Sequence, residues 1–354
     1  MTNGLFTRLL EEAQGSGYNA SAEDGKGGGM ATIGVGLIGL GRHGMRYARH
    51  LLEPLPEARL VAVCRRDLKQ GKAFAAEQGL RFYPEFRELV ADRDVHAVIV
   101  VTPPSLTREI CLEAIAWKKP LLIEKPLATT GADARVMVSA ASAAGIPLMT
   151  AHTVRYEAAV AALREKLETV GTRRYLVVSN RGEPQREVID DPAGYGGRGV
   201  LLETGIHLLD LIRFLTGEEI AEVSCEMDRP VPGGPENRAL ASLRTTGDFR
   251  CILDASRVTG GRVSRAEWVG EHGQIGGDWI HHRVWRITSR DVMEEWRVDN
   301  RPTVVTVMRL FLQALERGGS MPVTGLDGQR AVEIADACYR SSAEGGRCIR
   351  LGES

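Results

Sequence analysis

The chain lacks the charge surplus and the long apolar run that would place it in several common classes. Its 45 Lys and Arg balance 46 Asp and Glu, which leaves a net charge of -1. This balance speaks against nucleic acid or an anionic membrane as a partner, because both attract a basic excess. No stretch approaches the roughly 18 consecutive apolar residues of a membrane span. Glu11 and Glu12 interrupt the N-terminus where a secretory signal would be apolar.

The spacing of the cysteines also lacks the patterns of metal sites and disulfide frameworks. The six cysteines form no C-x-x-C pair, and Cys64 and Cys111 lie in apolar patterns. We therefore expect buried, reduced thiols in a cytoplasmic protein, and no metal site.

The remaining composition is that of an ordinary globular protein. With 354 residues, 43% hydrophobic and 26% charged, the chain is long enough for about two domains. Residues 13–30 are rich in Gly, Ser, Ala and Asn and end in Gly27-Gly28-Gly29. This composition predicts a flexible N-terminal extension over residues 1–30, with one short helix at Leu5–Glu12.

A glycine-rich turn is the most informative feature of the sequence. The apolar run Ile33–Ile38 leads into Gly39-x-Gly41-x-x-Gly44, and a helical pattern follows. The first glycine allows a sharp turn, the second lets a phosphate approach the backbone, and the third lets the helix pack closely on the strand. Strand, glycines and helix together predict that a dinucleotide pyrophosphate binds at the helix N-terminus.

The end of the second predicted strand bears on which dinucleotide binds. An acidic residue is usual there, about 20 residues after the glycines, because it binds the ribose hydroxyls of NAD. This chain has Arg65-Arg66-Asp67 instead. A guanidinium cannot accept those hydrogen bonds but can donate a fork of them to a 2′-phosphate, which favours NADP(H) over NAD(H). In the alternative interpretation, Arg65 and Arg66 are solvated and Asp67 binds the ribose.

The two halves of the chain differ in their order of predicted helices and strands. Residues 31–150 alternate short strands with helices such as Leu68–Gln78 and Ser105–Trp117, which predicts a doubly wound parallel sheet of the Rossmann type. Residues 151–354 are mostly strands joined by turns, which predicts a largely antiparallel sheet with one face on the core. Strands are expected at 33–38, 59–64, 96–101, 120–124 and 146–149, and then at 174–179, 220–226, 238–244, 250–256, 267–270 and through 262–276 and 278–288.

Turn and helix signals complete the second half. Gly260-Gly261 and Gly276-Gly277 are predicted to be turns between strands. Two late helices are predicted, Thr303–Glu316 and Gly328–Ala343, and the second has an apolar face. The last helix is expected to pack either within the second domain or against the first domain.

Lys125 lies where the chemistry of such a sheet is expected. The predicted strand 120–124 runs into Glu124-Lys125-Pro126, and ligands of open parallel sheets bind beyond the carboxyl ends of the strands. A lysine beside a positively charged nicotinamide ring gives up its proton readily, which suits it to exchange a proton with a hydroxyl. The alternative is a surface lysine before a turn proline.

A second group of titratable residues lies at the start of a later helix. Glu203 and His207 are four residues apart, and His207 and Asp210 are three apart, so all three can share one helical stripe. Leucines and Ile206 supply an apolar wall around them. Such a group is either a hydrogen-bonded core network or a site.

Four motifs, in this order, resemble those of the Gfo/Idh/MocA oxidoreductase family: Gly39-x-Gly41-x-x-Gly44, Thr102-Pro103-Pro104, Glu124-Lys125-Pro126 and Glu203-x-Gly205-x-His207-x-x-Asp210. The resemblance spans about residues 33–352 and includes Gly270-Glu271-His272-Gly273 and Asp327-Gly328. It implies an N-terminal Rossmann domain and a C-terminal α/β domain with a large, mostly antiparallel open sheet, with the substrate between them.

The resemblance also implies roles. Hydride would pass between nicotinamide C4 and a carbinol or carbonyl carbon of a sugar, cyclitol or related polyol. Lys125 would transfer the proton, His207 would act as a relay or substrate ligand, and Glu203 would occupy the position of the catalytic aspartate. A cis Lys125–Pro126 bond is implied as well. The cofactor-binding residues are expected to be Gly39, Leu40, Gly41, Arg42, His43, Gly44, Arg65, Arg66, Thr102, Pro103, Pro104, Glu124 and Lys125. The substrate-binding residues are expected to be Lys125, Arg155, Tyr156, Glu203 and His207, with Arg181, Arg186 and Tyr195 as further candidates.

Three residues depart from the family pattern. Glu203 replaces the aspartate, and its extra methylene moves the carboxylate by about 1.5 Å, a displacement that can cost on the order of 100-fold in rate. Arg65 replaces the ribose-binding acid, and Thr107 stands where histidine is common. These departures weaken any assignment of a standard inositol or glucose substrate.

Other functions stay open at this point. A non-catalytic regulator that senses the nucleotide, or a reductase of a C=N bond or a tetrapyrrole, would have the same fold. The positive charge of Arg155, Arg181 and Arg186 hints at an acidic or phosphorylated substrate. Because the second half has more apolar residues than one helical layer covers, a homodimer or homotetramer on the outer face of its sheet is expected.

Overall fold

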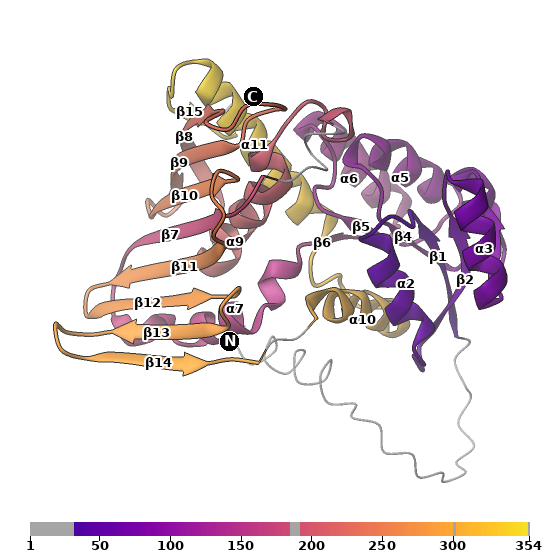
Figure 1. Ribbon diagram of the computed structural model, residues 1–354, viewed down its shortest axis with the longest axis horizontal. Coiled ribbons are helices and arrows are strands. Elements are labelled where there is room, and N and C mark those ends of the chain that lie inside the picture. Colours follow the sequence, from indigo (N-terminus) through magenta and orange to yellow (C-terminus); the bar gives the residue numbers. More distant parts are fainter. Residues whose placement is uncertain (1–31, 185–191, 300–301, 353–354) are drawn as a thin grey trace, which may run out of the picture.

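A six-stranded parallel sheet forms the first half of the protein, whose computed structural model describes residues 32–184, 192–299 and 302–352 (Figure 1). The strand order is β3-β2-β1-β4-β5-β6, the order of a Rossmann sheet. The strand order reverses between β1 and β4, and open parallel sheets bind their ligands at this point, beyond the carboxyl ends of the strands. The strands are β1 (Ile33–Ile38), β2 (Ala58–Cys64), β3 (Arg81–Tyr83), β4 (Ala97–Val100), β5 (Leu121–Glu124) and β6 (Leu148–Ala151).

Helices cover both faces of this sheet, which explains why β4 and β5 are entirely buried. On one face, Val35 and Leu37 pack with Tyr47 of α2 and with Phe311, which comes from α10 late in the chain. On the other face lie the apolar sides of α5 and α6. The helices are α2 (Gly44–Leu52), α3 (Leu68–Gln78), α4 (Phe86–Ala91), α5 (Thr107–Ala116), α6 (Gly131–Ala144) and α10 (Thr303–Arg317).

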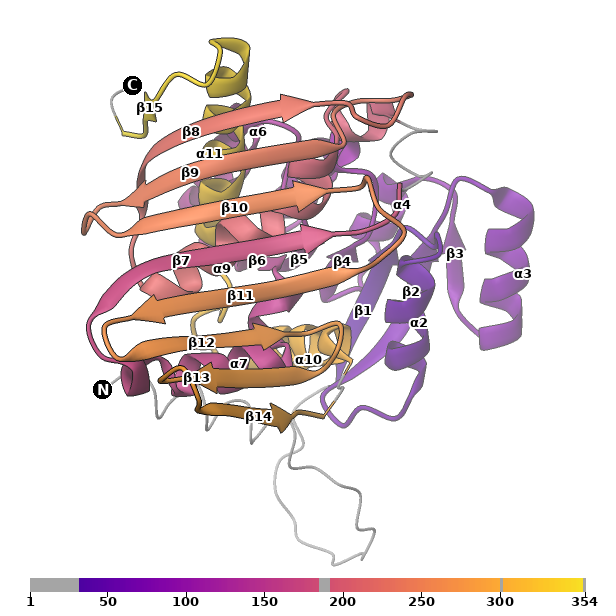
Figure 2. The same ribbon diagram turned by 60° about the vertical axis from the view of Figure 1, so that its left-hand side comes forward.

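A nine-stranded sheet dominates the second half and presents one broad face to the outside (Figure 2). Its order is β14-β13-β12-β11-β7-β10-β9-β8-β15, and all neighbours are antiparallel except β7 and β10. The strands are β7 (Arg173–Arg181), β8 (Ile220–Asp228), β9 (Arg238–Thr245), β10 (Arg250–Ser256), β11 (Val263–Gly270), β12 (Gly273–Asp278), β13 (Arg283–Ile287), β14 (Met293–Arg297) and β15 (Ile349–Arg350). The two sheets confirm the predicted fold class.

Helices line the inner face of this sheet. Leu176, Leu253 and Trp268 alternate inward along their strands and pack against these helices. The outer face instead leaves Tyr175 and Ile252 exposed. The helices are α7 (Ala158–Glu165), α9 (Ile206–Thr216) and α11 (Gly325–Ala343), with the short turns η1 (Pro104–Leu106), η2 (Thr153–Tyr156), η3 (Leu167–Val170), η4 (Pro192–Tyr195) and the π-helix η5 (Leu201–Gly205).

The predicted turn at Gly276-Gly277 is wrong. Both glycines lie inside β12, and the connection to β13 falls at residues 279–282. A Cβ on Gly276 would lie 2.1 Å from the ring of Trp285, and a Cβ on Gly277 would lie 2.8 Å from the carbonyl oxygen of Ala159. These glycines are needed for close packing across the sheet and against α7, not for a reversal of the chain.

The last helix, α11, contacts elements of both halves. It packs against α9 and β8 in the second half and against α6 and β6 in the first. A Cβ on Gly328 would lie 2.3 Å from Thr150 Oγ1, so helix and strand approach closely there. The predicted N-terminal extension and Arg186 lie outside the described residues. Among the helices described, none is long and apolar enough to cross a membrane.

Candidate active site

The glycine turn after β1 has the geometry that its sequence predicts. Gly39 has a φ of +99°, and a Cβ there would lie 2.1 Å from the carbonyl oxygen of Val101. A Cβ on Gly44 would lie 1.9 Å from the carbonyl oxygen of Gly39, so α2 rests directly on the turn. A Cβ on Gly41, by contrast, would meet no atom of residues 32–184, 192–299 or 302–352 within 4 Å. The Gly41 side is therefore the open side, where a pyrophosphate could reach the backbone.

The end of β4 supplies a second feature that fits a dinucleotide. Thr102 Oγ1 is buried and has no hydrogen-bond partner in the described part of the chain, which costs free energy unless a ligand supplies one. Pro103 is half-buried and Pro104 begins η1, while Leu40 is buried and Arg42 is exposed beside the glycine turn. An open glycine turn next to an unpartnered hydroxyl fits the dinucleotide that the sequence predicts.

Arg65 lies against the glycine turn, whereas Asp67 does not. Arg65 Nη1 donates a hydrogen bond to the carbonyl oxygen of Leu40 at 2.9 Å. The Asp67 side chain accepts from the backbone N–H of Gln70 at 3.0 Å and so caps the N-terminus of α3. Arg66 is exposed.

Glu124 connects the glycine turn to Lys125. Its carboxylate lies 2.7 Å from His43 Nε2 and accepts hydrogen bonds from the Tyr47 hydroxyl at 2.6 Å and the Lys125 backbone N–H at 3.0 Å. Burial alone would raise the pKa of Glu124, but the hydrogen bond and charge of His43, with Lys125 and Tyr47, hold this pKa below its usual value. A buried carboxylate thereby joins β5 to α2.

Lys125 extends from the first domain toward the second. The Lys125–Pro126 peptide is cis, as the family resemblance implies. Lys125 Nζ donates to the backbone carbonyl oxygen of Glu203 at 2.8 Å and lies 3.9 Å from Glu203 Oε1. The Lys125 side chain is only 16% exposed. Lys125 and the Glu203 carboxylate therefore lie close together across the domain boundary.

Glu203 is also held from the opposite side, by residues that the sequence did not predict. Its Oε2 accepts a hydrogen bond from the Thr204 hydroxyl and lies 3.6 Å from Arg257 Nη2. Arg257 Nη1 in turn donates to Asn180 Oδ1 at 2.9 Å, and its Nη2 donates to the Thr204 hydroxyl. The Glu203 carboxylate thus lies between two cations, Lys125 and Arg257.

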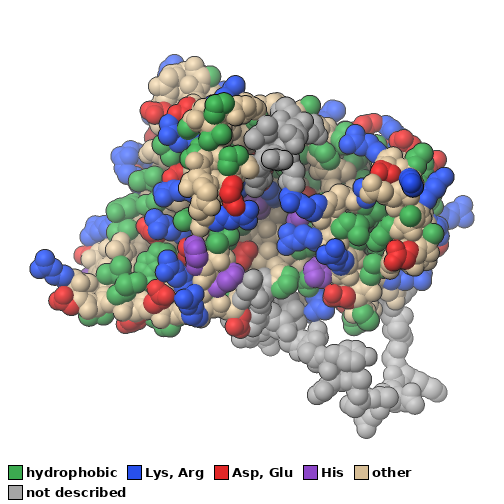
Figure 3. Space-filling model, in the orientation of Figure 1, with side chains coloured by type: hydrophobic (Ala, Val, Ile, Leu, Met, Phe, Trp, Pro, Cys, Tyr) green, Lys and Arg blue, Asp and Glu red, His purple; other side chains and the backbone are tan. Residues whose placement is uncertain are grey.

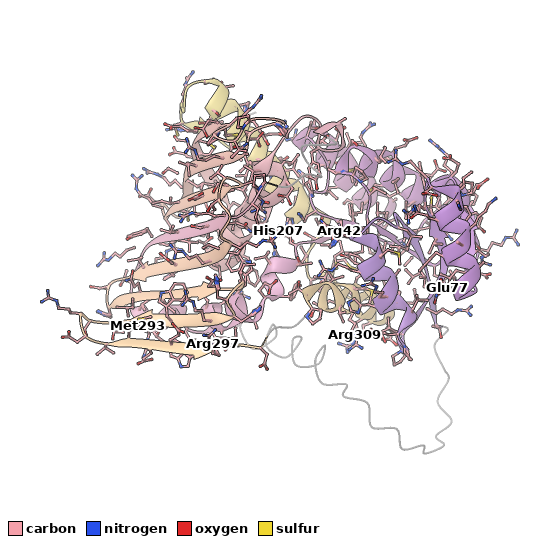
Figure 4. All side chains as sticks on the ribbon, in the orientation of Figure 1. Arg42, Glu77, His207, Met293, Arg297 and Arg309 are labelled. Carbon is pink, nitrogen blue, oxygen red and sulfur yellow. The ribbon has the colours of Figure 1, made fainter. Side chains whose placement is uncertain are left out.

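His207 lies between the two domains, opposite the glycine turn. In Figure 4, His207 and Arg42 lie on facing sides of the region where the two domains meet, and Figure 3 shows Lys, Arg and His side chains gathered around a hollow there. Burial, and then the charges of Lys125 and other cations, lower the pKa of His207 well below its ordinary value. Its ring is therefore neutral near pH 7.

Asp210 belongs to a different network from Glu203. The π-helix η5 ends at Gly205, before α9 begins, so Glu203 and Asp210 do not share a regular helical stripe. Asp210 Oδ2 accepts from Arg155 Nε at 2.7 Å, and Arg155 also pairs with Asp327 at 3.0 Å. Arg155 and Asp210 are both buried. The structure thus commits Arg155, an expected substrate ligand, to a buried ion-pair network.

Several other expected lining residues make contacts within the protein. Tyr156 is 7% exposed and packs in the core beside α10. Arg181 Nε donates to Asp254 on the neighbouring strand β10 at 2.6 Å, and Tyr195 packs against the hydrophobic core. Thr107, which stands where histidine is common in the family, is buried, and its hydroxyl donates to the main-chain carbonyl of Leu127 at 2.6 Å. The hint of an acidic substrate therefore loses Arg155 and Arg181.

Sequence analysis missed His152, Arg257 and Asn180. Because His152 follows β6 as Lys125 follows β5, its position at the carboxyl end of a parallel strand was a usable signal. Arg257 directly follows β10 and Asn180 lies in β7, both far from any motif, and no local pattern marks them. Within the described ranges, no three or more His, Cys, Asp or Glu residues are grouped to hold a metal ion.

Comparisons with known proteins assign the family. Residues 33–152 match the Gfo/Idh/MocA oxidoreductase family with its NAD-binding Rossmann fold, and residues 168–276 match the C-terminal domain of the same family. The chain therefore belongs to the Gfo/Idh/MocA family of oxidoreductases, as the resemblance indicated.

Individual relatives are distant but cover nearly the whole chain. An inositol 2-dehydrogenase of Burkholderia cenocepacia is 27% identical over 331 residues, which cover 89% of this chain and 95% of the relative. A 1,5-anhydro-D-fructose reductase of Ensifer adhaerens is 29% identical over 299 residues, 81% of this chain and 89% of the relative. The crystal structure of an aldose-aldose oxidoreductase from Caulobacter crescentus shares the fold, with a TM-score of 0.80, 24% identity and coverage of 91% of this chain and 100% of that one.

Proposed function

We propose that the protein is an NADP(H)-dependent oxidoreductase that transfers hydride between nicotinamide C4 and a carbinol or carbonyl carbon of a sugar, cyclitol or related polyol. The observation that carries the proposal is the position of Lys125, whose Nζ extends from the carboxyl end of β5 to within 2.8 Å of the Glu203 carbonyl. In this proposal residues 31–150 bind the dinucleotide, and residues 151–354 bind the substrate and form the oligomer.

In the proposed reaction the cofactor would exchange the hydride and protein side chains would exchange the proton. A bound oxidised nicotinamide would supply C4 as the acceptor of the hydride that leaves the carbinol carbon. Lys125 accepts the hydroxyl proton while the C–O bond becomes C=O. Neutral His207 takes that proton onward, and reduction runs the same steps in reverse. The Glu203 carboxylate holds the Lys125 ammonium beside the substrate.

Arg257 helps to explain how glutamate serves at this position. The Glu203 carboxylate lies 3.6 Å from Arg257 Nη2 and 3.9 Å from Lys125 Nζ, one cation for each carboxylate oxygen. We infer that Arg257 holds the end of the longer side chain, so that the extra methylene need not move the carboxylate away from Lys125.

Two observations support the cofactor and substrate classes. Arg65 stands against the glycine turn, while Asp67 is occupied as a helix cap, which favours a 2′-phosphate over the bare ribose of NAD. The relatives named above are an inositol dehydrogenase and an anhydrofructose reductase, which favours a polyol or sugar substrate.

A substrate screen tests the proposal directly. The full chain is titrated with NADPH and NADH, and then supplied with a panel of cyclitols, sugars and their ketones while the absorbance of the reduced nicotinamide is followed. We expect turnover with at least one polyol–ketone pair. Cofactor binding without turnover on any member of the panel would instead favour a nucleotide-sensing regulator.

Replacing Lys125 tests the mechanism. The variant Lys125→Ala should bind the dinucleotide almost normally but turn over about 100- to 10,000-fold more slowly, because a positioned general acid-base contributes that much. Lys72→Ala, at an exposed position on α3, is the matched control and should behave as the wild type. His207→Ala should have a smaller effect than Lys125→Ala, since water can partly replace a relay. Normal turnover of Lys125→Ala would remove the proposed mechanism.

A further inference from the structure

His152 and Lys125 leave the first sheet side by side. Strands β5 and β6 are parallel neighbours, and Glu124 pairs with Ala151 in their register. Lys125 and His152 therefore follow the ends of adjacent strands at the same level. His152 is 1% exposed, so its ring is buried at the edge where Lys125 reaches toward the second domain.

The His152 ring lies between His207 and Asp210. Its centroid is 6.3 Å from that of His207, and the two rings are nearly perpendicular, at 81°. His152 Nδ1 also lies 3.7 Å from Asp210 Oδ2, which is close enough for an electrostatic contact but longer than a hydrogen bond. His207 and Asp210 are three residues apart on α9 and so face the same neighbour.

The buried nitrogens of the two rings lack hydrogen-bond partners. Among the described residues, neither nitrogen of His152 has a partner, and of the two nitrogens of His207 only Nδ1 is both buried and unpartnered. A buried polar atom without a hydrogen-bond partner lowers the stability of the fold, so the presence of three such nitrogens calls for an explanation. The two rings can satisfy each other, directly or through one bridging water.

We propose that His152 is a positioning residue that, together with Asp210, holds His207 in the tautomer with its proton on Nδ1, so that the lone pair of Nε2 serves as the base at the active site. The Asp210 carboxylate, fixed by Arg155, draws the proton of His152 onto Nδ1. His152 Nε2 is then an acceptor, and it receives the Nδ1–H of His207. Nε2 of His207 is left free to take the proton that Lys125 removes from the substrate.

Both rings must be neutral for this arrangement, and their surroundings favour it. Burial lowers the pKa of His152 despite Asp210, and burial together with nearby cations lowers the pKa of His207 well below its ordinary value. The charged or titratable groups that act on His207 are Lys125, His152, His43 and Arg257. Those that act on His152 are Asp210, Arg155, Asp327 and Arg213.

The inference rests on the proposed polyol oxidation, because it assigns His207 a base's part in that reaction, but its first test needs no substrate. The chain has eight histidines, few enough to assign by single substitutions in proton–nitrogen spectra of the ring-labelled full-length protein. We expect His207 to carry its proton on Nδ1 at pH 7. A proton on Nε2 in the wild type would overturn the inference whether or not any polyol is oxidised.

Two variants of His152 separate positioning from mere packing. In His152→Phe, which keeps a ring but no nitrogens, we expect the Nδ1–H preference of His207 to disappear. In His152→Gln, whose amide oxygen can still accept the Nδ1–H, we expect the preference to be kept. An unchanged tautomer in His152→Phe would contradict the proposed role.

Activity is the second readout of the same variants. An orienting partner contributes about 10- to 100-fold in other histidine sites, so kcat of His152→Phe should fall by that factor with KM nearly unchanged. Because a neutral His152 that accepts the Nδ1–H of His207 also stabilises the protonated His207 ring, its loss should lower the pKa of His207, and the pH at which kcat of oxidation rises should move downward in His152→Phe. His152→Gln should recover most of kcat. Equal loss of kcat in both variants, with the wild-type pH profile, would show a structural role only.

Discussion

Arg65 is the single residue on which the choice of dinucleotide depends. Its guanidinium is held at the glycine turn by a 2.9 Å hydrogen bond to the Leu40 carbonyl, and its other donors remain available to a 2′-phosphate. A charged hydrogen bond contributes about 1.5–3 kcal/mol, or roughly 10- to 150-fold in affinity. We therefore expect the wild type to bind NADPH more tightly than NADH by about that factor.

The variant Arg65→Ala should lose this preference. Its affinity for NADPH should fall by roughly 10- to 150-fold, while its affinity for NADH should change little. Arg59→Ala, an exposed arginine at the other end of β2, is the control and should keep the preference. Fluorescence titration of the reduced cofactors measures both affinities. Equal wild-type affinities, or a preference for NADH that survives Arg65→Ala, would contradict the assignment.

At the scale of the element, the strand–turn–helix unit β1–α2 gives its glycines separate tasks. Gly44 is needed for packing, because a Cβ there would lie 1.9 Å from the carbonyl oxygen of Gly39. Gly41 is not needed for packing among the described residues, because a Cβ there meets none of their atoms within 4 Å. A methyl group at position 41 would instead obstruct a ligand bound at the open side of the turn.

Alanine at Gly41 and alanine at Gly44 should therefore impair different properties of the protein. Gly41→Ala should leave the free energy of unfolding within about 0.5 kcal/mol of the wild type but weaken dinucleotide binding about 10-fold or more. Gly44→Ala should destabilise the fold by about 1–3 kcal/mol, because strand and helix must move apart. Urea unfolding and cofactor titration of both variants make the comparison. Normal dinucleotide binding by Gly41→Ala would mean that the pyrophosphate does not lie there.

At the scale of the whole molecule, the outer face of the second sheet exposes large apolar side chains. Tyr175, Leu240 and Ile252 are 41%, 43% and 47% exposed on three adjacent strands, β7, β9 and β10. Neighbouring apolar side chains on an uncovered sheet are typical of a subunit interface. We propose that this face joins two copies of the chain in a homodimer or homotetramer.

Light scattering at micromolar concentration tests this assembly. The wild type should have the mass of a dimer or tetramer, and Ile252→Glu should lower it, because a buried unpaired charge opposes association. Val136→Glu, at a residue 41% exposed on α6 of the first domain, should leave the mass unchanged. A monomeric wild type would rule out the proposed interface.

Local sequence was sufficient wherever short-range geometry decides the structure. The strand, the three glycines and the helix after them were predictable because turn sterics depend on residues next to one another. The helix at Leu68–Gln78 was predicted with its observed limits, because the residues that end it, the Asp67 cap and Gly79 with a φ of 66°, lie directly next to it in the sequence. The position of Lys125 followed from its place at the end of a parallel strand.

Only the tertiary structure decided which distant side chains meet. Glu203 and Asp210 look equivalent on a helical stripe, yet the π-helix η5 and the packing of α9 place one beside Lys125 and the other beside Arg155 and His152. Gly276 and Gly277 have the composition of a turn, but Trp285 and α7 approach so closely that only glycine fits in the strand. These outcomes depend on contacts between segments far apart in the chain, which the packing of two domains determines and no local propensity encodes.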